Sequence, residues 1–253
     1  MRRAPLLFLL ALSITACGKK GPLIYPEMLV PAAPSNVTLR QSGTSMKLSF
    51  ELPSKDRAGR NLANLAGVTI RKRDAVVDQA PVCSSCTDDY FLFKKLNLDL
   101  LPTGTQRKGS LMLVLDADVR QGRNYSYIVS GFTREDVTGA SSAPVASTVV
   151  QSPLPPVLQA ISQPTEINLE FVGLPPHEGV FVGYNVYRAL KGEEFSYWPL
   201  NKEPLTANRF SDAGLDRGTT YVYVVRTVVR ISSGAFAESG MSNEVEAKLK
   251  DDE

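Results

Sequence analysis

The chain has 253 residues, a formal net charge of +2 at pH 7 and a 43% share of hydrophobic residues. This length suits two small domains better than one, and such a hydrophobic share is enough to build folded cores. A nearly neutral chain lacks the basic surface that nucleic-acid binding usually requires, so we expect no nucleic-acid partner.

Residues 1–16 have the layout of a secretory signal peptide. Arg2 and Arg3 form a positive start, residues 6–11 form an apolar core, and residues 13–16 are mostly small. The apolar run is shorter than the roughly twenty residues that a membrane-spanning helix needs. We therefore expect residues 1–16 to be removed rather than to anchor the chain.

The end of this leader resembles the bacterial lipobox, in which a cysteine is acylated and becomes the first mature residue. The matching residues are Ile14-Thr15-Ala16-Cys17. The resemblance implies three acyl chains, palmitate among them, on Cys17, and two or more chains are needed for stable attachment. Gly18 follows instead of an aspartate, which by the sorting rule of enteric bacteria implies the outer membrane, facing the periplasm. An ordinary signal peptide followed by a chance cysteine is the alternative.

Residues 17–33 are rich in proline and glycine, which favours a flexible, extended tether. Over about ten residues, the start CGKKGPL resembles the mature start of the LptM family of small lipopolysaccharide-assembly lipoproteins, although Lys19 stands where that family tends to have leucine. A plain spacer is one interpretation, and a docking element for an envelope protein is the other. The residues expected to contact such a partner are Gly21, Pro22, Leu23, Tyr25 and Pro26.

Two further cysteines, Cys83 and Cys86, stand close together in PVCSSCTDDY. In an oxidising periplasm such a pair favours a disulfide, which we expect to shape a local turn because so short a loop recovers little chain entropy. A zinc site is one alternative, but it needs four ligands and the chain has one histidine. A thioredoxin-like redox pair is the other, and it would need a βαβ setting.

The rest of the chain shows the alternation of apolar and polar residues that is typical of β-strands. In SMKLSFE, the apolar residues Met46, Leu48 and Phe50 alternate with polar ones, and TEINLEFV and YVYVVRTVV are also strand-like. Turn residues separate these runs, and no long segment carries a helical stripe. Short strands at regular spacing predict an all-β fold of sandwiches.

Residues 152–250 resemble a fibronectin type III domain over nearly their whole length. GYNVYR resembles strand C of that family, and LDRGTTY resembles its tyrosine-containing signature. The resemblance implies that Tyr221 is a tyrosine corner, whose hydroxyl bonds back to the chain. Two departures are that Asp216-Arg217 replaces the usual proline region and that Phe171 stands where tryptophan is common.

Residues 34–151 repeat this order more loosely, with an insert at about residues 74–108. VRQGRNY echoes the signature of the second half and places Tyr125 at the equivalent corner. We therefore expect two tandem immunoglobulin-like sandwiches joined near residues 151–156. Prolines at that joint limit the available backbone angles, which favours a semi-rigid rod.

No motif for catalysis is present: the sequence has no GxSxG elbow, no glycine-rich phosphate loop and no HExxH. His177 lies between turn-forming residues, so we expect an exposed loop histidine. Two aromatic segments, residues 90–93 and 195–198, are expected either to pack against the sandwiches or to form contact surfaces.

We therefore expect no catalytic residue, no metal and no cofactor. The expected function is that of a non-catalytic outer-membrane lipoprotein, acting as an interaction or scaffold module in envelope assembly, with an envelope protein as its partner. A link to lipopolysaccharide export depends on the CGKKGPL start. The alternative is an accessory polysaccharide- or peptidoglycan-binding protein, or a hydrolase whose site has no recognised motif.

Overall fold

The computed structural model describes residues 25–76 and 89–251, which form strands and one short 3-10 helix, η2 (Pro26–Met28). The strands of the first half are β1 (Ser35–Ser42), β2 (Ser45–Glu51), β3 (Leu65–Val76), β4 (Phe91–Asn97), β5 (Thr105–Lys108), β6 (Leu111–Asp116), β7 (Arg123–Thr133), β8 (Thr138–Ser141) and β9 (Val145–Thr148). Those of the second half are β10 (Val157–Ser162), β11 (Glu166–Val172), β12 (Val180–Leu190), β13 (Arg209–Ala213), β14 (Tyr221–Arg230), β15 (Phe236–Glu238) and β16 (Val245–Ala247).

The first half folds into a sandwich of two sheets. One sheet has the order β1-β2-β6-β5, and the other has the order β4-β3-β7-β8 with β9 beside β7. The alternation predicted for β2 is observed, because Met46, Leu48 and Phe50 are buried in the core between the sheets while the intervening residues are only partly buried. Side chains that alternate in this way place one face of a strand in the core and the other outside it.

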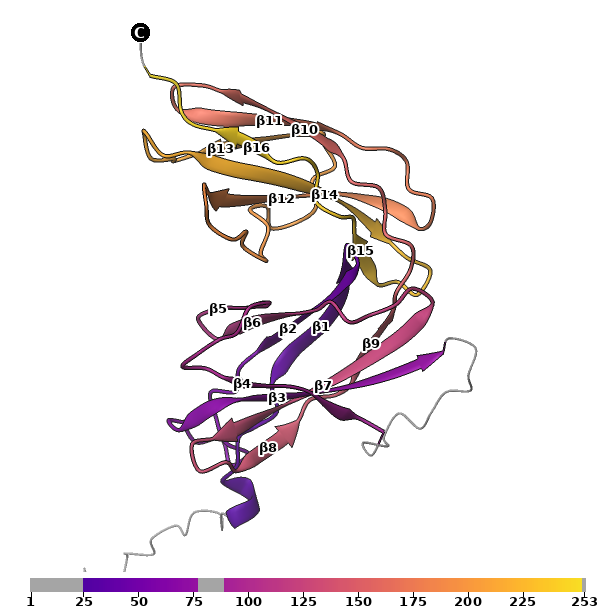
Figure 1. Ribbon diagram of the computed structural model, residues 1–253. Coiled ribbons are helices and arrows are strands. Elements are labelled where there is room, and N and C mark those ends of the chain that lie inside the picture. Colours follow the sequence, from indigo (N-terminus) through magenta and orange to yellow (C-terminus); the bar gives the residue numbers. More distant parts are fainter. Residues whose placement is uncertain (1–24, 77–88, 252–253) are drawn as a thin grey trace, which may run out of the picture.

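The second half folds into an equivalent sandwich. The sheet β10-β11-β13 packs against β12 and β14, with β15 and β16 both paired to β14. Its core includes Ile167, Leu169 and Phe171 from β11 and Val225 from β14, all of them fully or almost fully buried. The prediction of an all-β chain with two tandem immunoglobulin-like sandwiches is confirmed, and Figure 1 shows them end to end.

Both sandwiches contain a tyrosine whose hydroxyl bonds back to the chain five residues earlier. The hydroxyl oxygen of Tyr125 accepts a hydrogen bond from the backbone N–H of Arg120 at 2.9 Å. The hydroxyl oxygen of Tyr221 accepts one from the backbone N–H of Asp216 at 3.0 Å. This is tyrosine-corner geometry, and it holds the turn that leads into β7 and into β14.

Each sandwich also has an ion pair beside this corner, fully buried in the first sandwich and partly buried in the second. In the first, Nζ of Lys72 lies 2.6 Å from Oδ2 of Asp116, and both side chains are at least 96% buried. The hydroxyl of Tyr127, which lies opposite Lys72 in the β3–β7 register, donates to the same carboxylate oxygen at 2.6 Å. Burial and this carboxylate raise the pKa of Tyr127 far above its ordinary value, so the hydroxyl remains a donor.

The second sandwich repeats the same three-residue arrangement. Nη1 of Arg188 lies 2.7 Å from Oδ2 of Asp212, and the hydroxyl of Tyr223 donates to that oxygen at 2.8 Å. Arg188 and Tyr223 lie opposite each other between β12 and β14, as Lys72 and Tyr127 do in the first sandwich. The two halves therefore share a polar plan as well as a strand order.

The two sandwiches are joined by a shared sheet. β15 pairs in parallel with β1, so that Gln41 lies opposite Ala237 and Ser42 opposite Glu238. This pairing merges one sheet of each sandwich into a single eight-stranded sheet with the main order β12-β14-β15-β1-β2-β6-β5. The side chain of Gln41 also bonds both backbone groups of Val150 in the connecting segment, at 2.9 and 3.0 Å. Figure 1 shows β15 at the waist between the two lobes.

The chain enters the first sandwich at the end that is farthest from the second (Figure 1). The backbone oxygens of Met28 and Val30 accept hydrogen bonds from residues 58 and 57, and the N–H of Ala32 donates to the oxygen of Lys55, each at 3.0 Å. The part of the predicted tether from Met28 onward is thus hydrogen-bonded to the first sandwich.

We expect Lys72→Met to destabilise the first sandwich by about 3–5 kcal/mol, because it leaves the buried Asp116 carboxylate without the cation of its ion pair. Lys95→Met is the matched control, since its ion pair with Asp136 is largely exposed and should cost less than about 1 kcal/mol. Urea unfolding followed by circular dichroism measures both variants. Equal losses in the two variants would contradict a special role for the buried pair.

Candidate functional site

Several residues singled out from the sequence lie outside the described part of the chain. They are Cys17, Gly21, Pro22, Leu23, Cys83 and Cys86. Of the expected docking residues that are described, Tyr25 is 55% exposed and Pro26 begins η2. Lipid attachment, the disulfide and the docking role therefore stay predictions.

Two further kinds of site are absent from the described residues. Within residues 25–76 and 89–251, no three histidine, cysteine, aspartate or glutamate side chains come together as a metal site would require. No helix in the same ranges is long and apolar enough to cross a membrane. His177 is exposed in a bend between β11 and β12.

The two aromatic segments divide between packing and exposure. Tyr90 is buried with its hydroxyl 2.6 Å from Oγ of Ser126, and the ring of Phe93 packs edge-on against Tyr127. Phe91 and Leu92 are more than half exposed on β4, at the edge of its sheet. The second segment, residues 195–198, is partly buried and contacts the first sandwich.

That contact shows how strongly the shared sheet is curved. The outermost strands β12 and β5 are six strand steps apart, which in a flat sheet would separate them by roughly 29 Å at about 4.8 Å a step. Nevertheless the side chain of Gln106 on β5 accepts from the N–H of Tyr197 at 2.7 Å and donates to the oxygen of Phe195 at 2.9 Å, just beyond β12. The outer face of the sheet is therefore concave and encloses a small cleft.

The cleft is organised around one carboxylate, that of Glu238 on β15. From the first sandwich, Oγ of Ser42 and Nζ of Lys47 donate to its Oε2 at 2.8 and 3.0 Å. From the second, Nδ2 of Asn185 and the hydroxyl of Tyr187 donate to its Oε1 at 2.6 and 2.7 Å. We name these five residues the Glu238 cluster, and their hydrogen bonds connect both sandwiches through a side chain that is 95% buried.

Burial alone would raise the pKa of Glu238, but attraction to Lys47 and the hydrogen bonds outweigh burial and lower it to about 2. Burial lowers the pKa of Lys47 and is only partly offset by Glu238, since Arg226 and Arg40 add like charge. Burial and Glu238 raise the pKa of Tyr187. At neutral pH the carboxylate is therefore ionised and the tyrosine neutral.

The hydrogen bonds and the low pKa of Glu238 fit a structural role for this carboxylate better than a catalytic one. Each oxygen of Glu238 already accepts two hydrogen bonds, so the carboxylate has no free lone pair directed at a substrate proton. A general base needs a pKa near the working pH, and a value of about 2 is far below it. The adjoining cleft has a volume of only about 50 Å³, enough for a few water molecules.

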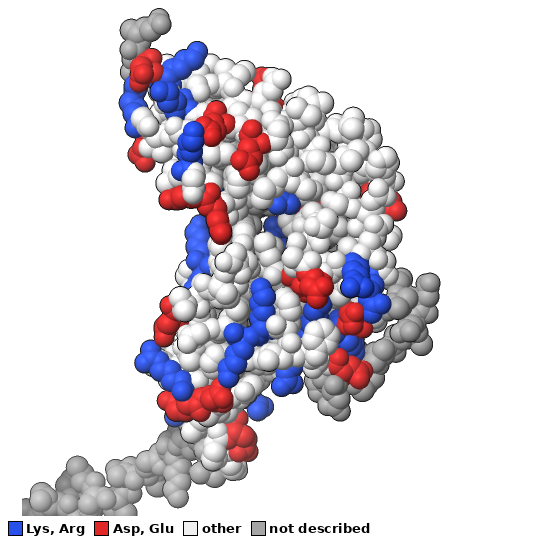
Figure 2. Space-filling model, viewed as in Figure 1, with Lys and Arg blue, Asp and Glu red and all other residues white. Residues whose placement is uncertain are grey.

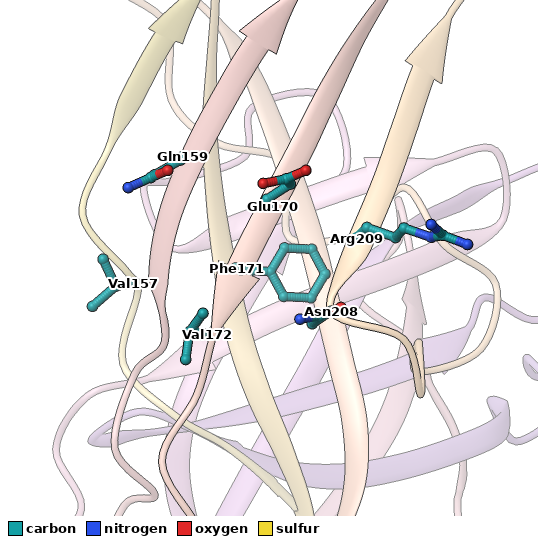
Figure 3. A pocket seen from close by; sticks show the side chains of 7 residues that line it. All are labelled: Val157, Gln159, Glu170, Phe171, Val172, Asn208 and Arg209. Carbon is teal, nitrogen blue, oxygen red and sulfur yellow. The ribbon is translucent and has the colours of Figure 1, made fainter.

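A wider groove of about 390 Å³ lies over the outer face of the sheet formed by β10, β11 and β13 (Figure 3). Its polar lining consists of Gln159, Glu170, Asn208 and Arg209. Glycoside hydrolysis ordinarily uses two carboxylates, and Glu170 is the single carboxylate among the described residues that line this groove. The groove therefore gives no support to the hydrolase alternative.

Large exposed apolar side chains gather in the first part of the second sandwich. Val157 and Val172 lie opposite each other in the β10–β11 register and are 63% and 69% exposed. The complete set in this part of the chain is Leu154, Val157, Ile161, Val172, Leu174, Val180 and Phe181. The opposed pair Val157 and Val172 is exposed apolar surface that a protein partner could cover.

The pKa of Glu238 implies a pH-dependent junction. Because the pKa falls from 4.5 to about 2 on folding, the stabilisation from this carboxylate is complete above pH 4.5 and is lost as the pH falls toward 2. We expect Glu238→Gln to remove this dependence and to weaken the β1–β15 pairing by about 3–5 kcal/mol at pH 7, since Lys47 stays buried without a carboxylate. Amide hydrogen exchange of β1 and β15 measures the effect.

Glu246→Gln is the matched control for this prediction, because Glu246 forms an exposed ion pair with Lys191 on the same sandwich. It should leave exchange at β1 and β15 unchanged. Protection and pH dependence in Glu238→Gln that equal those of the unaltered chain would show that the cluster does not hold the junction.

Comparison with known proteins adds little to this description. No protein-family model matches the chain, and no curated protein does. A crystal structure of the chicken CNTN1 FN1–FN3 domains aligns with 88% of this chain and 68% of its own, at 12% identity and a TM-score of 0.35. A structure described as a myokine aligns with 39% of this chain and 98% of its own, at 19% identity and a TM-score of 0.31. The architecture of the two sandwiches is established by the strand pairing itself.

Proposed function

We propose that the chain is a lipid-anchored outer-membrane protein that serves as a non-catalytic interaction or scaffold module in the periplasm. The observation that carries this proposal is the continuous eight-stranded sheet, which makes one body of the two sandwiches. A fibronectin type III fold does not by itself name a ligand, but it is widely used to present contact surfaces.

The place where the N-terminal segment joins the first sandwich supports a protein that is anchored at one end and extends away from the membrane. η2 lies at the end of the first sandwich that is remote from β15 (Figure 1), so an anchor at Cys17 would place the second sandwich away from the membrane. The residues between Cys17 and Met28 can span at most roughly 35 Å when fully extended. The exposed apolar residues of the second sandwich would then face the periplasm, where a protein partner could reach them.

The link to lipopolysaccharide export is the most specific part of the proposal. It depends on the CGKKGPL start, with Gly21, Pro22, Leu23, Tyr25 and Pro26 as the docking residues. Tyr25 is more than half exposed, so its ring is available to a partner.

We expect Cys17→Ala to remove the protein from the outer-membrane fraction, because no acyl chain could then be attached. Cys83→Ala is the matched control and should leave the protein in the membranes. Fractionation followed by immunoblotting measures both variants. Retention of Cys17→Ala in the outer membrane would contradict the lipid anchor.

The docking role is tested by replacing Gly21, Pro22 and Leu23 with serine and crosslinking the full-length protein in its own membranes. We expect an outer-membrane assembly protein to be recovered with the unaltered chain and to be lost with the triple variant. A variant with serine at Ala32 and Ala33, beyond the docking residues, controls for altered composition. Equal recovery from all three chains would reduce the tether to a spacer.

A further inference from the structure

Four cationic side chains, one of them Lys47 of the Glu238 cluster, lie on the same face of the shared sheet as Glu238. Arg40 lies opposite Lys47 in the β1–β2 register. Glu238 lies opposite Val228, which stands two residues from both Arg226 and Arg230 on β14. Directly opposed residues, and residues two apart on one strand, share a face of a sheet. Arg40, Lys47, Arg226 and Arg230 therefore all project from the face that carries Glu238.

Two aromatic rings hold these cations in pairs. The guanidinium carbons of Arg40 and Arg230 lie 5.3 and 5.7 Å from the ring centre of Phe236. Nζ of Lys47 and the guanidinium carbon of Arg226 lie 5.6 and 5.7 Å from the ring centre of Tyr187. Each pair brings together one cation from the first sandwich and one from the second, so like charges meet at the junction.

The negative charge at this place does not balance the positive charge. Lys47 forms its ion pair with Glu238, whereas no ion pair of the described residues includes Arg40, Arg226 or Arg230. Arg226 donates through Nη1 to the backbone oxygen of Ser239 at 2.8 Å, and a guanidinium has five N–H donors. Figure 2 shows Lys and Arg side chains in the recess between the two lobes.

Arg226 also lines the small cleft together with the hydroxyl-bearing residues Ser196 and Tyr197. The planar guanidinium fork of arginine is well suited to binding an oxyanion such as phosphate. Arg40, Arg226 and Arg230 form no ion pair with a carboxylate among the described residues. A phosphate ligand, with a charge of about −2, would balance more of their positive charge than a carboxylate ligand with a single negative charge.

We propose that this face of the junction binds the phosphate group of a soluble ligand, with Arg226 as the main contact and Arg40 and Arg230 at the rim. The cleft itself is too small to hold a phosphate in its depth, so the phosphate lies at its mouth beside Arg226. Arg40 and Arg230 do not line the cleft, but they are exposed on the same face of the sheet. The first sandwich separates this face from η2 (Figure 1), and a site so far from the chain entry favours a dissolved phosphate ester over a bilayer surface.

The test is isothermal titration calorimetry of the full-length protein in an uncharged detergent, with inorganic phosphate and glucose 6-phosphate as probes. Saturable binding is expected for both probes, and the affinity should fall at least tenfold in Arg226→Gln. Arg40→Gln alters an exposed side chain, so its fold is safe, and it should weaken binding by a smaller factor. Arg209→Gln is the matched control, because Arg209 is exposed on the second sandwich away from the junction. The affinity of this variant for both probes should equal that of the unaltered chain.

Three outcomes would overturn the proposal. One is a heat signal that sodium chloride at equal ionic strength reproduces, and another is an equal loss of affinity in Arg209→Gln. The third is binding to phosphatidylglycerol vesicles without binding to either soluble probe, which would assign the charge cluster to a membrane surface instead.

Discussion

The parallel pairing of β15 with β1 is the constraint on which the arrangement of the two sandwiches depends. Both strands would otherwise be sheet edges, and an exposed edge is a template for pairing with other chains. Pairing them covers two edges at once and merges two sheets into one. Since a sheet is stiff along its hydrogen bonds, the second sandwich is positioned by backbone geometry as well as by the prolines of the connecting segment.

The Glu238 cluster makes this pairing specific. A buried ion pair contributes little net stability, because desolvation of both charges offsets their attraction, and apolar residues of similar size could fill the same space. Apolar side chains would, however, tolerate a shift in register. Glu238 receives donors from Ser42 and Lys47 on one side and from Asn185 and Tyr187 on the other, and all four bonds form only in the observed register. The cluster therefore selects one arrangement among several of similar compactness.

Local patterns were sufficient to predict the sandwiches. The alternation of Met46, Leu48 and Phe50 identified a strand and its buried face, because period-two burial is a local property. The junction could not be predicted in this way, since Gln41 and Ala237 are distant in sequence and no short-range pattern encodes their parallel pairing. One signal was present: Gln41 continues the inward series of Val37 and Leu39, and a polar residue at an inward position needs a polar partner. That partner is the backbone of Val150.

Some polar features occur in both sandwiches, whereas others occur only at the junction between them. The ion pair of Lys72 with Asp116 and that of Arg188 with Asp212 occur at equivalent places, so they belong to the plan that both sandwiches share. The Glu238 carboxylate and its surrounding cations occur at one place, the junction, and need residues from both sandwiches. A separated sandwich could keep its own ion pair but could not form the junction. A property that depends on the junction therefore requires both halves in one chain, which is a physical reason for the tandem arrangement.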